Sequence, residues 1–398
     1  MRPVVGVICE YDPFHIGHAR QFTLIRQQLP DAYIICVMSG CFTQRGMPAL
    51  FAPAFRAEAA LRAGADAVLE LPCAFAVREA ENFALGGVSL LNALGCVTHL
   101  SFGLETDNLP QLQAAAAVLE TPDSVFSDTL HASLANGSPF SAAQAVAVAS
   151  SLTAVHGIDF PPPEALSHLL AQPNNILGVC YLRALLRLKS SILPLPVLRV
   201  GRYHASEFTR EGFPSATAVR KAYLSDDFPA AEQACGYPLT GIPRHCPDAL
   251  DTLLLYRLRS MDADALRILP DSTEGLENRI TKAARVAVSR TDLLARLKTR
   301  RYTYTRLNRL ATHALLGITS DLLTLHPLPE YARLLGFRQE SRELLTAFRD
   351  SSVPVIAKAA DGNPANPLYA LDARAYDLWA LGAELPAGLM YRQKIVKC

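Results

Sequence analysis

The chain has 398 residues, half of them hydrophobic, so it can bury a sizeable core in two domains or in one large domain with an appendage. Its 38 basic and 37 acidic residues leave a net charge of +1, which excludes a global electrostatic attraction to nucleic acid or to an anionic membrane. Nine cysteines without a CxxC pair indicate neither a disulfide framework nor a structural metal. No apolar run is long enough for a membrane span, so we expect a protein of the reducing cytoplasm.

Short apolar runs alternate with helical patterns in the N-terminal half. This alternation predicts parallel strands buried on both faces and joined by crossover helices, a doubly wound, Rossmann-like α/β domain over residues 1–225. The predicted strands are Val4–Cys9, Tyr33–Met38, Ala67–Leu71, Thr98–Phe102 and Val197–Val200, and the clearest helices are His18–Gln28, Phe55–Ala63 and Glu79–Leu94. The Ala- and Leu-rich stretch 111–167 predicts further helices, interrupted near Pro161–Pro163.

After Arg220 the strand signals fade and helical spacing dominates. We expect a mostly helical C-terminal domain over residues 226–398, with a loose boundary where Pro and Gly cluster between residues 225 and 250. Its predicted helices are Leu253–Met261, Arg279–Arg290, Asp292–Leu297, Tyr304–Leu316 and Leu344–Arg349.

The strongest chemical signal follows the first predicted strand, where His15 and His18 form an HxGH motif on the turn into a helix. Helix N-termini present unpaired N–H groups and a partial positive charge, so they bind phosphates readily. Gly17 lets the backbone approach a nucleotide, and the two imidazoles can hydrogen-bond a triphosphate as charge builds on its α-phosphoryl group. A lone HxGH is as often a turn histidine and a cap histidine, but the strand before it and the helix after it favour the functional interpretation.

A second signature lies about two hundred residues further on. Ser215 and Thr217 suit a helix N-terminus that holds phosphate oxygens, and Arg220 falls one turn into that helix. Nucleotidyltransferases of the HxGH class have a similar S-x-T-x-x-R segment. Alone it is typical of an ordinary N-cap with a surface arginine, but together with His15 and His18 it predicts the catalytic set His15, His18, Ser215, Thr217 and Arg220.

The sequence resembles the tRNA(Met) cytidine acetate ligase family over nearly its whole length. Residues 10–18 resemble the family's EYNPFHNGH, and residues 38–46 resemble MSGNFVQRG. Further matches follow in order at residues 56–58 with 64–66 and 70–72, then at 101–105, 173–178, 199–204, 274–279, 298–306 and 333–337.

The resemblance implies that acetate and ATP form acetyl-adenylate with release of pyrophosphate, and that the acetyl group passes to the exocyclic amine of the wobble cytidine of elongator tRNA(Met). It implies ATP contacts from Val7, Ile8, Cys9, Glu10, Tyr11, Asp12, Pro13, Phe14, His15, Ile16, Gly17, His18, Ala19 and Arg20, from Gly103, from Asn174 or its neighbour Asn175, and from Arg199. Mg²⁺ is expected with ATP, held mainly by the phosphates, and no side-chain metal ligands are indicated.

The chain departs from the family pattern at several positions. The family's Asp-Lys pair before the Arg56 helix is replaced by residues that include Pro53, and Leu104 replaces a serine after the fourth strand. Within the first motif Asp12 and Ile16 stand where the family has asparagine. The histidines and the glycine of that motif are retained, so nucleotide binding is expected to persist.

The segment from Lys298 to Arg309 carries five basic residues, two tyrosines and no acid. It predicts a local RNA-binding patch formed by Lys298, Arg300, Arg301, Tyr302 and Arg306, with Tyr302 and Tyr304 stacking on unpaired bases. A solvated cationic helix face with core tyrosines is the alternative. Arg45 and Arg56 would extend the basic track toward the nucleotide.

Two other functions stay open at this point. A small-molecule adenylyltransferase would use the same two motifs but would leave residues 226–398 without a task, and an RNA- or nucleotide-binding relative with impaired catalysis would account for Pro53 and Leu104. No feature of the sequence points to a protein partner.

Overall fold

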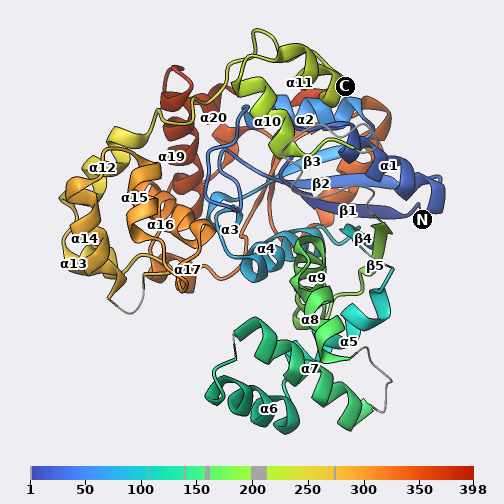
Figure 1. Ribbon diagram of the computed structural model, residues 1–398. Helices are drawn as coiled ribbons and strands as arrows, with labels where there is room; N and C mark the ends of the chain where they lie inside the picture. Colours follow the sequence, from blue (N-terminus) through green and yellow to red (C-terminus); the bar gives the residue numbers. More distant parts are fainter. Residues whose placement is uncertain (1, 106, 139, 157–161, 199–212, 273–274) are drawn as a thin grey trace.

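A computed structural model describes residues 2–105, 107–138, 140–156, 162–198, 213–272 and 275–398. At its centre lies an eight-stranded sheet (Figure 1). The strands β1 (Val4–Cys9), β2 (Tyr33–Ser39), β3 (Ala67–Leu71), β4 (His99–Leu104) and β5 (Leu193–Leu198) are mutually parallel in the order β5-β4-β1-β2-β3. The five strands predicted from apolar runs are therefore present, although the predicted end of β5 at residues 199–200 lies outside the described residues.

Alternate side chains of these strands enter different cores. Along β1, Val5 and Val7 belong to one hydrophobic cluster, whereas Val4 and Ile8 belong to the other. Because a strand directs successive side chains to opposite faces, a run that is apolar throughout must be covered on both sides. Helices α1 (Ile16–Gln28) and α2 (Pro53–Arg62) contribute to the first cluster, and α3 (Cys73–Ala76), α4 (Ala80–Ala93) and α9 (Pro173–Arg187) to the second. The predicted doubly wound α/β class is confirmed.

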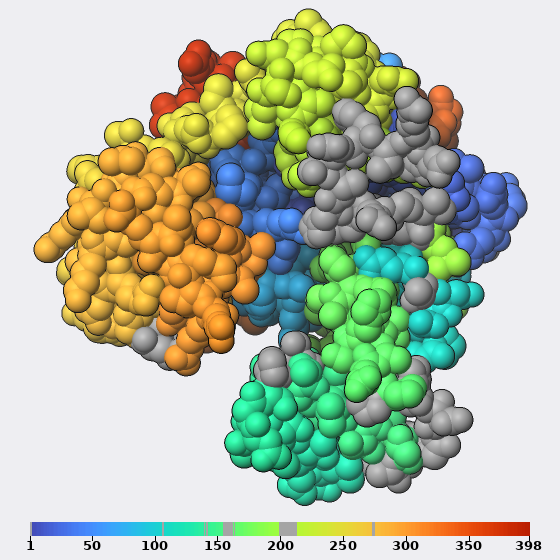
Figure 2. Space-filling view, in the orientation of Figure 1, coloured from blue at the N-terminus to red at the C-terminus, as the bar shows by residue number. Residues whose placement is uncertain are grey.

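The connection from β4 to β5 is long and helical. It contains α5 (Leu109–Glu120), α6 (Ser124–Ala135), α7 (Phe140–His156), α8 (Pro163–Ala171) and α9, and its α6–α7 part projects from the rest of the molecule (Figure 2). The sequence contains no Lys or Arg between Arg78 and Arg183, so the lobe formed by α5–α8 carries acidic residues and no positive side chain apart from its histidines. A surface of that charge does not attract nucleic acid.

The C-terminal part begins with α10 (Ala216–Leu224) and α11 (Phe228–Cys235), which pack against each other. A helical group with its own core follows: α12 (Asp251–Ser260), α13 (Ala263–Arg267), α14 (Leu276–Val286), α15 (Arg290–Leu297), α16 (Tyr304–Leu316) and the adjoining α17 (Ser320–Leu325). No described helix is both long enough and apolar enough to span a bilayer.

The chain then returns to the sheet. Strand β6 (Ala332–Phe337) pairs antiparallel with β3, and β7 (Val355–Ile356) and β8 (Val396–Lys397) both pair with β6. Helices α18 (Arg342–Ala347), α19 (Pro367–Gly382) and α20 (Leu389–Arg392) lie between these strands. The mostly helical C-terminal part thus supplies three strands that the sequence did not indicate, and the sheet is mixed rather than wholly parallel. The domain boundary at residue 225 stays a prediction.

Candidate functional site

A cavity of about 620 Å³ opens at the carboxyl ends of β1 and β4, which is where ligands bind in open α/β sheets. Its volume lies within the range of about 300–1,000 Å³ that is usual for small-molecule sites. The N-terminal residues of α1, α9, α10 and α16 contribute to its wall. The first turns of these four helices contain no acidic residue, so their partial positive charge is not neutralised from within. The cavity is therefore suited to a polyanion.

His15 and His18 lie together at the start of α1. Their rings stack with centroids 3.7 Å apart, and His15 is the N-cap residue of the helix. The backbone N–H of Gly17 donates to Nδ1 of His15 at 3.1 Å, and the backbone N–H of His15 donates to Nδ1 of His18 at 3.2 Å. Because each Nδ1 accepts a hydrogen bond, a neutral ring carries its proton on Nε2. Both imidazoles line the cavity, so Nε2–H is the ring donor that could contact a phosphate bound there.

Gly17 is required by the packing of this turn. A Cβ at this position would lie 2.9 Å from Cε1 of His15 and 3.3 Å from Cβ of Phe213. A side chain would therefore displace the His15 ring or the segment that leads into α10. The glycine of the HxGH motif allows the two predicted motifs to approach each other.

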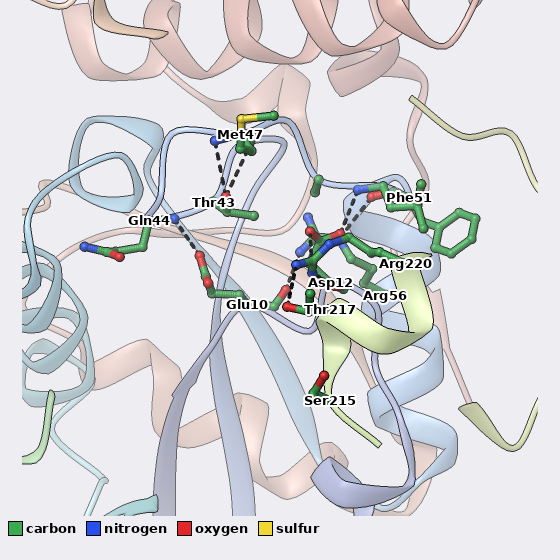
Figure 3. Close-up of polar contacts among 12 residues, drawn as sticks. Glu10, Asp12, Thr43, Gln44, Met47, Phe51, Arg56, Ser215, Thr217 and Arg220 are labelled. Carbon is green, nitrogen blue, oxygen red and sulfur yellow. Dashed lines mark hydrogen bonds and ion pairs between the residues drawn. The ribbon is translucent and has the colours of Figure 1, made fainter. Parts of the chain in front are cut away.

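The second motif reaches the same cavity from α10 (Figure 3). Ser215 is the N-cap residue, and its Oγ accepts a hydrogen bond of 3.0 Å from the backbone N–H of Ala218. Arg220 donates to the backbone carbonyl of Asp12, approaches the Asp12 carboxylate at 3.3 Å and donates to Thr217 Oγ1 at 3.3 Å. Asp12 also accepts the backbone N–H of Leu50 at 2.7 Å. Arg220 therefore fixes α10 against the turn that precedes α1.

The cavity brings together most of the residues predicted to act on ATP. The predicted residues that line it are Ile8, Cys9, Glu10, Tyr11, Asp12, His15, His18, Gly103, Asn174, Ser215, Thr217 and Arg220. Those that do not line it are Val7, Pro13, Phe14, Ile16, Gly17, Ala19, Arg20 and Asn175. The predicted ATP contact Arg199 lies outside the described residues. The roles of all these residues stay predictions.

The two neighbouring asparagines at the start of α9 differ in position. Asn174 lines the cavity, and its Nδ2 donates to Glu105 Oε1 at 2.9 Å. Asn175 is fully buried; its Nδ2 donates to Gln172 Oε1 at 2.7 Å, and its Oδ1 accepts the backbone N–H of Glu105 at 3.3 Å. Of the two, Asn174 is the one whose position suits a nucleotide contact, and Asn175 holds the start of the helix.

The basic segment reaches the other end of the cavity, because Thr305 and Arg309 of α16 contribute to the wall. Arg300 and Arg301 are exposed beside the start of this helix, and Tyr304 is 51% exposed. Lys298 donates to the carbonyl of Thr299 at 2.6 Å, and its ammonium lies 5.7 Å from the Tyr304 ring centre.

Two expectations for basic and aromatic residues, those for Tyr302 and Arg56, need correction. Tyr302 is only 5% exposed and packs in the core of the helical group, so its ring cannot stack on a base as predicted. Arg306 is partly exposed, donates to the Asp271 carbonyl at 2.8 Å and lies over Tyr302 at 5.1 Å, and its tRNA contact stays a prediction. Arg56 is fully buried and donates to the carbonyls of Glu10, Gly40 and Phe51, so it cannot extend an RNA track.

The structure adds cavity residues that the sequence did not single out. Arg309 has a buried Nε without a hydrogen-bond partner among the described residues, 3.6 Å from the Asp271 carboxylate. His245 lines the cavity, and burial lowers its pKa to about 4, so it is neutral at pH 7. Arg309 ends the basic segment but was not among the residues predicted to contact RNA, His245 lies in no recognised motif, and the tertiary fold brings both to the site. In the described part of the chain, no three His, Cys, Asp or Glu side chains gather as metal ligands.

Comparison with known proteins gives concordant results. A family model described as HIGH Nucleotidyl Transferase matches residues 2–392. A tRNA(Met) cytidine acetate ligase of Clostridium perfringens strain SM101 is 34% identical over 384 residues, covering 95% of this chain and 94% of the relative. The ligase of the same name from Acetivibrio thermocellus is 35% identical over 379 residues, covering 90% and 88%.

Solved structures are similar over the whole molecule. The apo form of Thermotoga maritima TmcAL superimposes with a TM-score of 0.89 at 29% identity, covering 99% of each chain. The same protein bound with alpha-thio ATP superimposes with a TM-score of 0.87 and the same coverage.

Proposed function

Because the chain belongs to the HIGH Nucleotidyl Transferase family and, within it, to the tRNA(Met) cytidine acetate ligases, we propose that it uses ATP to activate acetate and transfers the acetyl group to elongator tRNA(Met). The product is N4-acetylcytidine at the wobble position, with AMP and pyrophosphate. The observation that carries this proposal is the convergence of the two motifs on one cavity, where Arg220 contacts Asp12 across 208 positions of the chain.

In the activation step, an acetate oxygen attacks the α-phosphorus of ATP and pyrophosphate leaves. The chain's contribution is positioning and charge stabilisation, as is usual in transfers at phosphorus. The Nε2–H groups of His15 and His18 and the N-terminal amides of α1 and α10 point donors at the cavity where phosphate charge develops. Ser215, Thr217 and Arg220 complete the phosphate contacts, and Asn174 and Gly103 lie where a base or ribose would sit.

Magnesium accompanies ATP in this proposal. We expect the ion to be held mainly by the phosphates and by water. The ion would neutralise charge on the pyrophosphate leaving group.

The tRNA approaches from the α16 side. Arg300 and Arg301 can neutralise backbone phosphates, and the exposed Tyr304 can stack on an unpaired base beside the cavity wall formed by Thr305 and Arg309. The lobe of α5–α8 is acidic and repels the backbone. The target cytidine must be splayed out of its stack to reach the acetyl group. Residues 226–398 thus handle tRNA, although β6–β8 complete the catalytic sheet.

Elongator tRNA is a cytoplasmic substrate, and all nine cysteines are free thiols. Both facts support the cytoplasm as the compartment in which the protein acts.

The test is exchange of labelled pyrophosphate into ATP. We expect exchange that requires acetate and is abolished in His18→Ala with the fold intact, and acetate-dependent acetylation of elongator tRNA(Met) by the wild type. Exchange that requires a phosphorylated small molecule instead of acetate would indicate an adenylyltransferase. ATP binding without any exchange would indicate a relative that has lost catalysis.

A further inference from the structure

Glu10 places a carboxylate in the wall of the cavity. It follows β1 directly, part of its side chain is accessible from the cavity, and Oε1 accepts the backbone N–H of Gln44 at 2.5 Å. Among the described residues no ion pair involves it. Desolvation within the wall raises its pKa above the usual glutamate range, opposed by the Gln44 hydrogen bond. The family resemblance implies an ATP contact for Glu10, but a carboxylate in this position is an unfavourable neighbour for a triphosphate, so that contact does not suit the Glu10 side chain.

The other charged groups around Glu10 already have structural partners or face it from further away. Asp12, the second acidic residue of the wall, is engaged by Leu50 and Arg220. Arg45 and Arg220 lower the pKa of Glu10 through their charges, and Asp12 raises it. The buried Arg56 donates to the Glu10 backbone carbonyl and not to its carboxylate. Glu10 is therefore left with one backbone donor and unused acceptor capacity.

Glu10 lies between the residues proposed to bind the phosphates of ATP and the loop that faces the proposed tRNA surface. Figure 3 shows its side chain directed toward the loop that carries Thr43 and Gln44, while Ser215 and Thr217 lie on α10. That loop is fastened to the helical group, because the Gly46 carbonyl accepts hydrogen bonds from Arg290 at 2.6 Å and from Thr312 Oγ1 at 2.6 Å. The carboxylate is thus turned toward the side from which tRNA approaches.

We propose that Glu10 accepts a hydrogen bond from the exocyclic amine of the target cytidine and takes the proton of that amine during acetyl transfer. This role rests on the proposed function and assigns its second half-reaction. The amine nitrogen attacks the acetyl carbonyl carbon, the C–N bond forms, and the bond from that carbon to the AMP oxygen breaks. AMP leaves with the electron pair, and the amine proton passes to the Glu10 carboxylate.

The chemistry of the acceptor supports this assignment. A carboxylate is the side chain that best accepts from the N4 amine of cytosine, whereas uracil presents an oxygen at that place and would meet repulsion. Glu10 would therefore serve both base selection and proton removal.

The experiment separates the two half-reactions in Glu10→Gln. Glutamine keeps the size and can still accept the Gln44 N–H, but it cannot take a proton. We expect acetate-dependent pyrophosphate exchange to stay within a few-fold of the wild type, while acetyl transfer to tRNA falls by about 10²–10⁴-fold. Glu10→Asp should recover part of the transfer. Glu79→Gln makes the same change at a carboxylate outside the cavity wall, beside Arg78 and Asn82, and should leave both activities unchanged.

The proposal is overturned if transfer by Glu10→Gln equals that of the wild type, or if exchange falls as far as transfer, because Glu10 would then act in activation or in folding. The single-turnover transfer rate against pH gives a second readout: the wild type should lose rate on the acid side as Glu10 is protonated, and Glu10→Gln should lack that limb. Absence of exchange in the wild type would instead refute the proposed function itself.

Discussion

The stacked rings of His15 and His18 are held by a hydrogen bond of 3.2 Å from the backbone N–H of His15 to Nδ1 of His18. His15 in turn caps α1 through its own Nδ1. One side chain of the HxGH motif thus has a structural task in addition to its proposed contact with phosphate, and the two tasks can be separated by mutation.

His15→Ala should lower the free energy of unfolding by about 0.5–2 kcal/mol, because the helix cap is removed, and should also abolish pyrophosphate exchange. His15→Asn should restore the stability, since asparagine is among the best N-cap residues, without restoring exchange. Denaturant unfolding and the exchange assay on both variants provide the measurement. Exchange recovered together with stability would mean that His15 only caps the helix.

The basic segment offers a second prediction. Arg300→Ala combined with Arg301→Ala should weaken tRNA binding, with ATP binding unchanged. The slope of log K for tRNA binding against log salt concentration should also decrease in magnitude, by about one for each backbone phosphate that is no longer neutralised. Tyr304→Ala should cost about 1–3 kcal/mol of tRNA binding, whereas Tyr302→Ala should lower stability instead, because Tyr302 is buried.

Arg62→Ala, an exposed arginine on α2, is the control for the removal of positive charge. Binding isotherms at several salt concentrations provide the measurement. Equal affinities for the double variant and the wild type at moderate salt would remove the segment from the tRNA surface.

Gly46 links the loop beside the active site to α16. Its φ is +75°, and an added Cβ would lie 2.6 Å from the backbone nitrogen of Arg309. Gly46→Ala should therefore be more destabilising than Gly241→Ala, which has a φ of +79° but no atom within 4 Å of the added Cβ. Thermal unfolding of the two variants isolates the packing against α16 from the backbone strain. An equal decrease in unfolding temperature for both variants would show that the close contact with α16 does not add to the destabilisation by Gly46→Ala.

The apolar runs were sufficient to predict the five parallel strands, because β1, β2 and β3 are buried along their whole length and Glu70 is the one charged residue within the five strands. The edge strand β5 is apolar as well, although Leu193 and Leu198 at its ends are exposed. Strand β6 was not predicted, because the charged Arg333 interrupts its apolar run. In the fold Arg333 lies opposite Glu70 in register and donates to its carboxylate at 2.6 Å, so a buried pair replaces the apolar contact. Sequence pattern alone cannot identify a charge that is neutralised by a strand 263 positions away.

The candidate site was predictable where it follows motifs and unpredictable where it depends on packing. The family resemblance carried by residues 10–18 and 38–46 is confirmed by the match over residues 2–392. The sequence left two alternatives open for Tyr302, a base-stacking residue or a core tyrosine, because an amphipathic residue has the same local pattern whether it faces solvent or the core, and the structure shows the second. The burial of Arg56 on α2 was not predicted, because its partners are backbone carbonyls of other segments. Arg309 became a cavity residue only through the packing of α16 against the Gly46 loop.

The buried carboxyl of Asp372 should give the protein a specific pH dependence of stability. It accepts hydrogen bonds from Tyr331 Oη at 2.5 Å and from the backbone N–H of Cys73 at 2.7 Å, and burial, with the nearby charge of Glu70, raises its pKa to about 7. An unfolded aspartate titrates near pKa ~3.9. Between these values the folded state holds a proton that the unfolded state has released, so this group's contribution to stability is lost as pH rises from about 4 to about 7.

Asp372→Asn removes the titration. The unfolding temperature of the variant relative to the wild type should therefore rise across that pH window. Parallel curves for the two proteins would show that Asp372 does not titrate there.

The central claim is that acetate is activated by direct attack on the α-phosphorus of ATP at the HxGH cavity. Acetate labelled with heavy oxygen in both carboxyl positions, incubated with ATP, elongator tRNA(Met) and the protein, tests this most directly when the AMP is analysed by mass spectrometry. The account predicts one heavy oxygen in the phosphate of AMP for each acetyl group transferred. Unlabelled AMP, or label found in inorganic phosphate beside ADP, would contradict it.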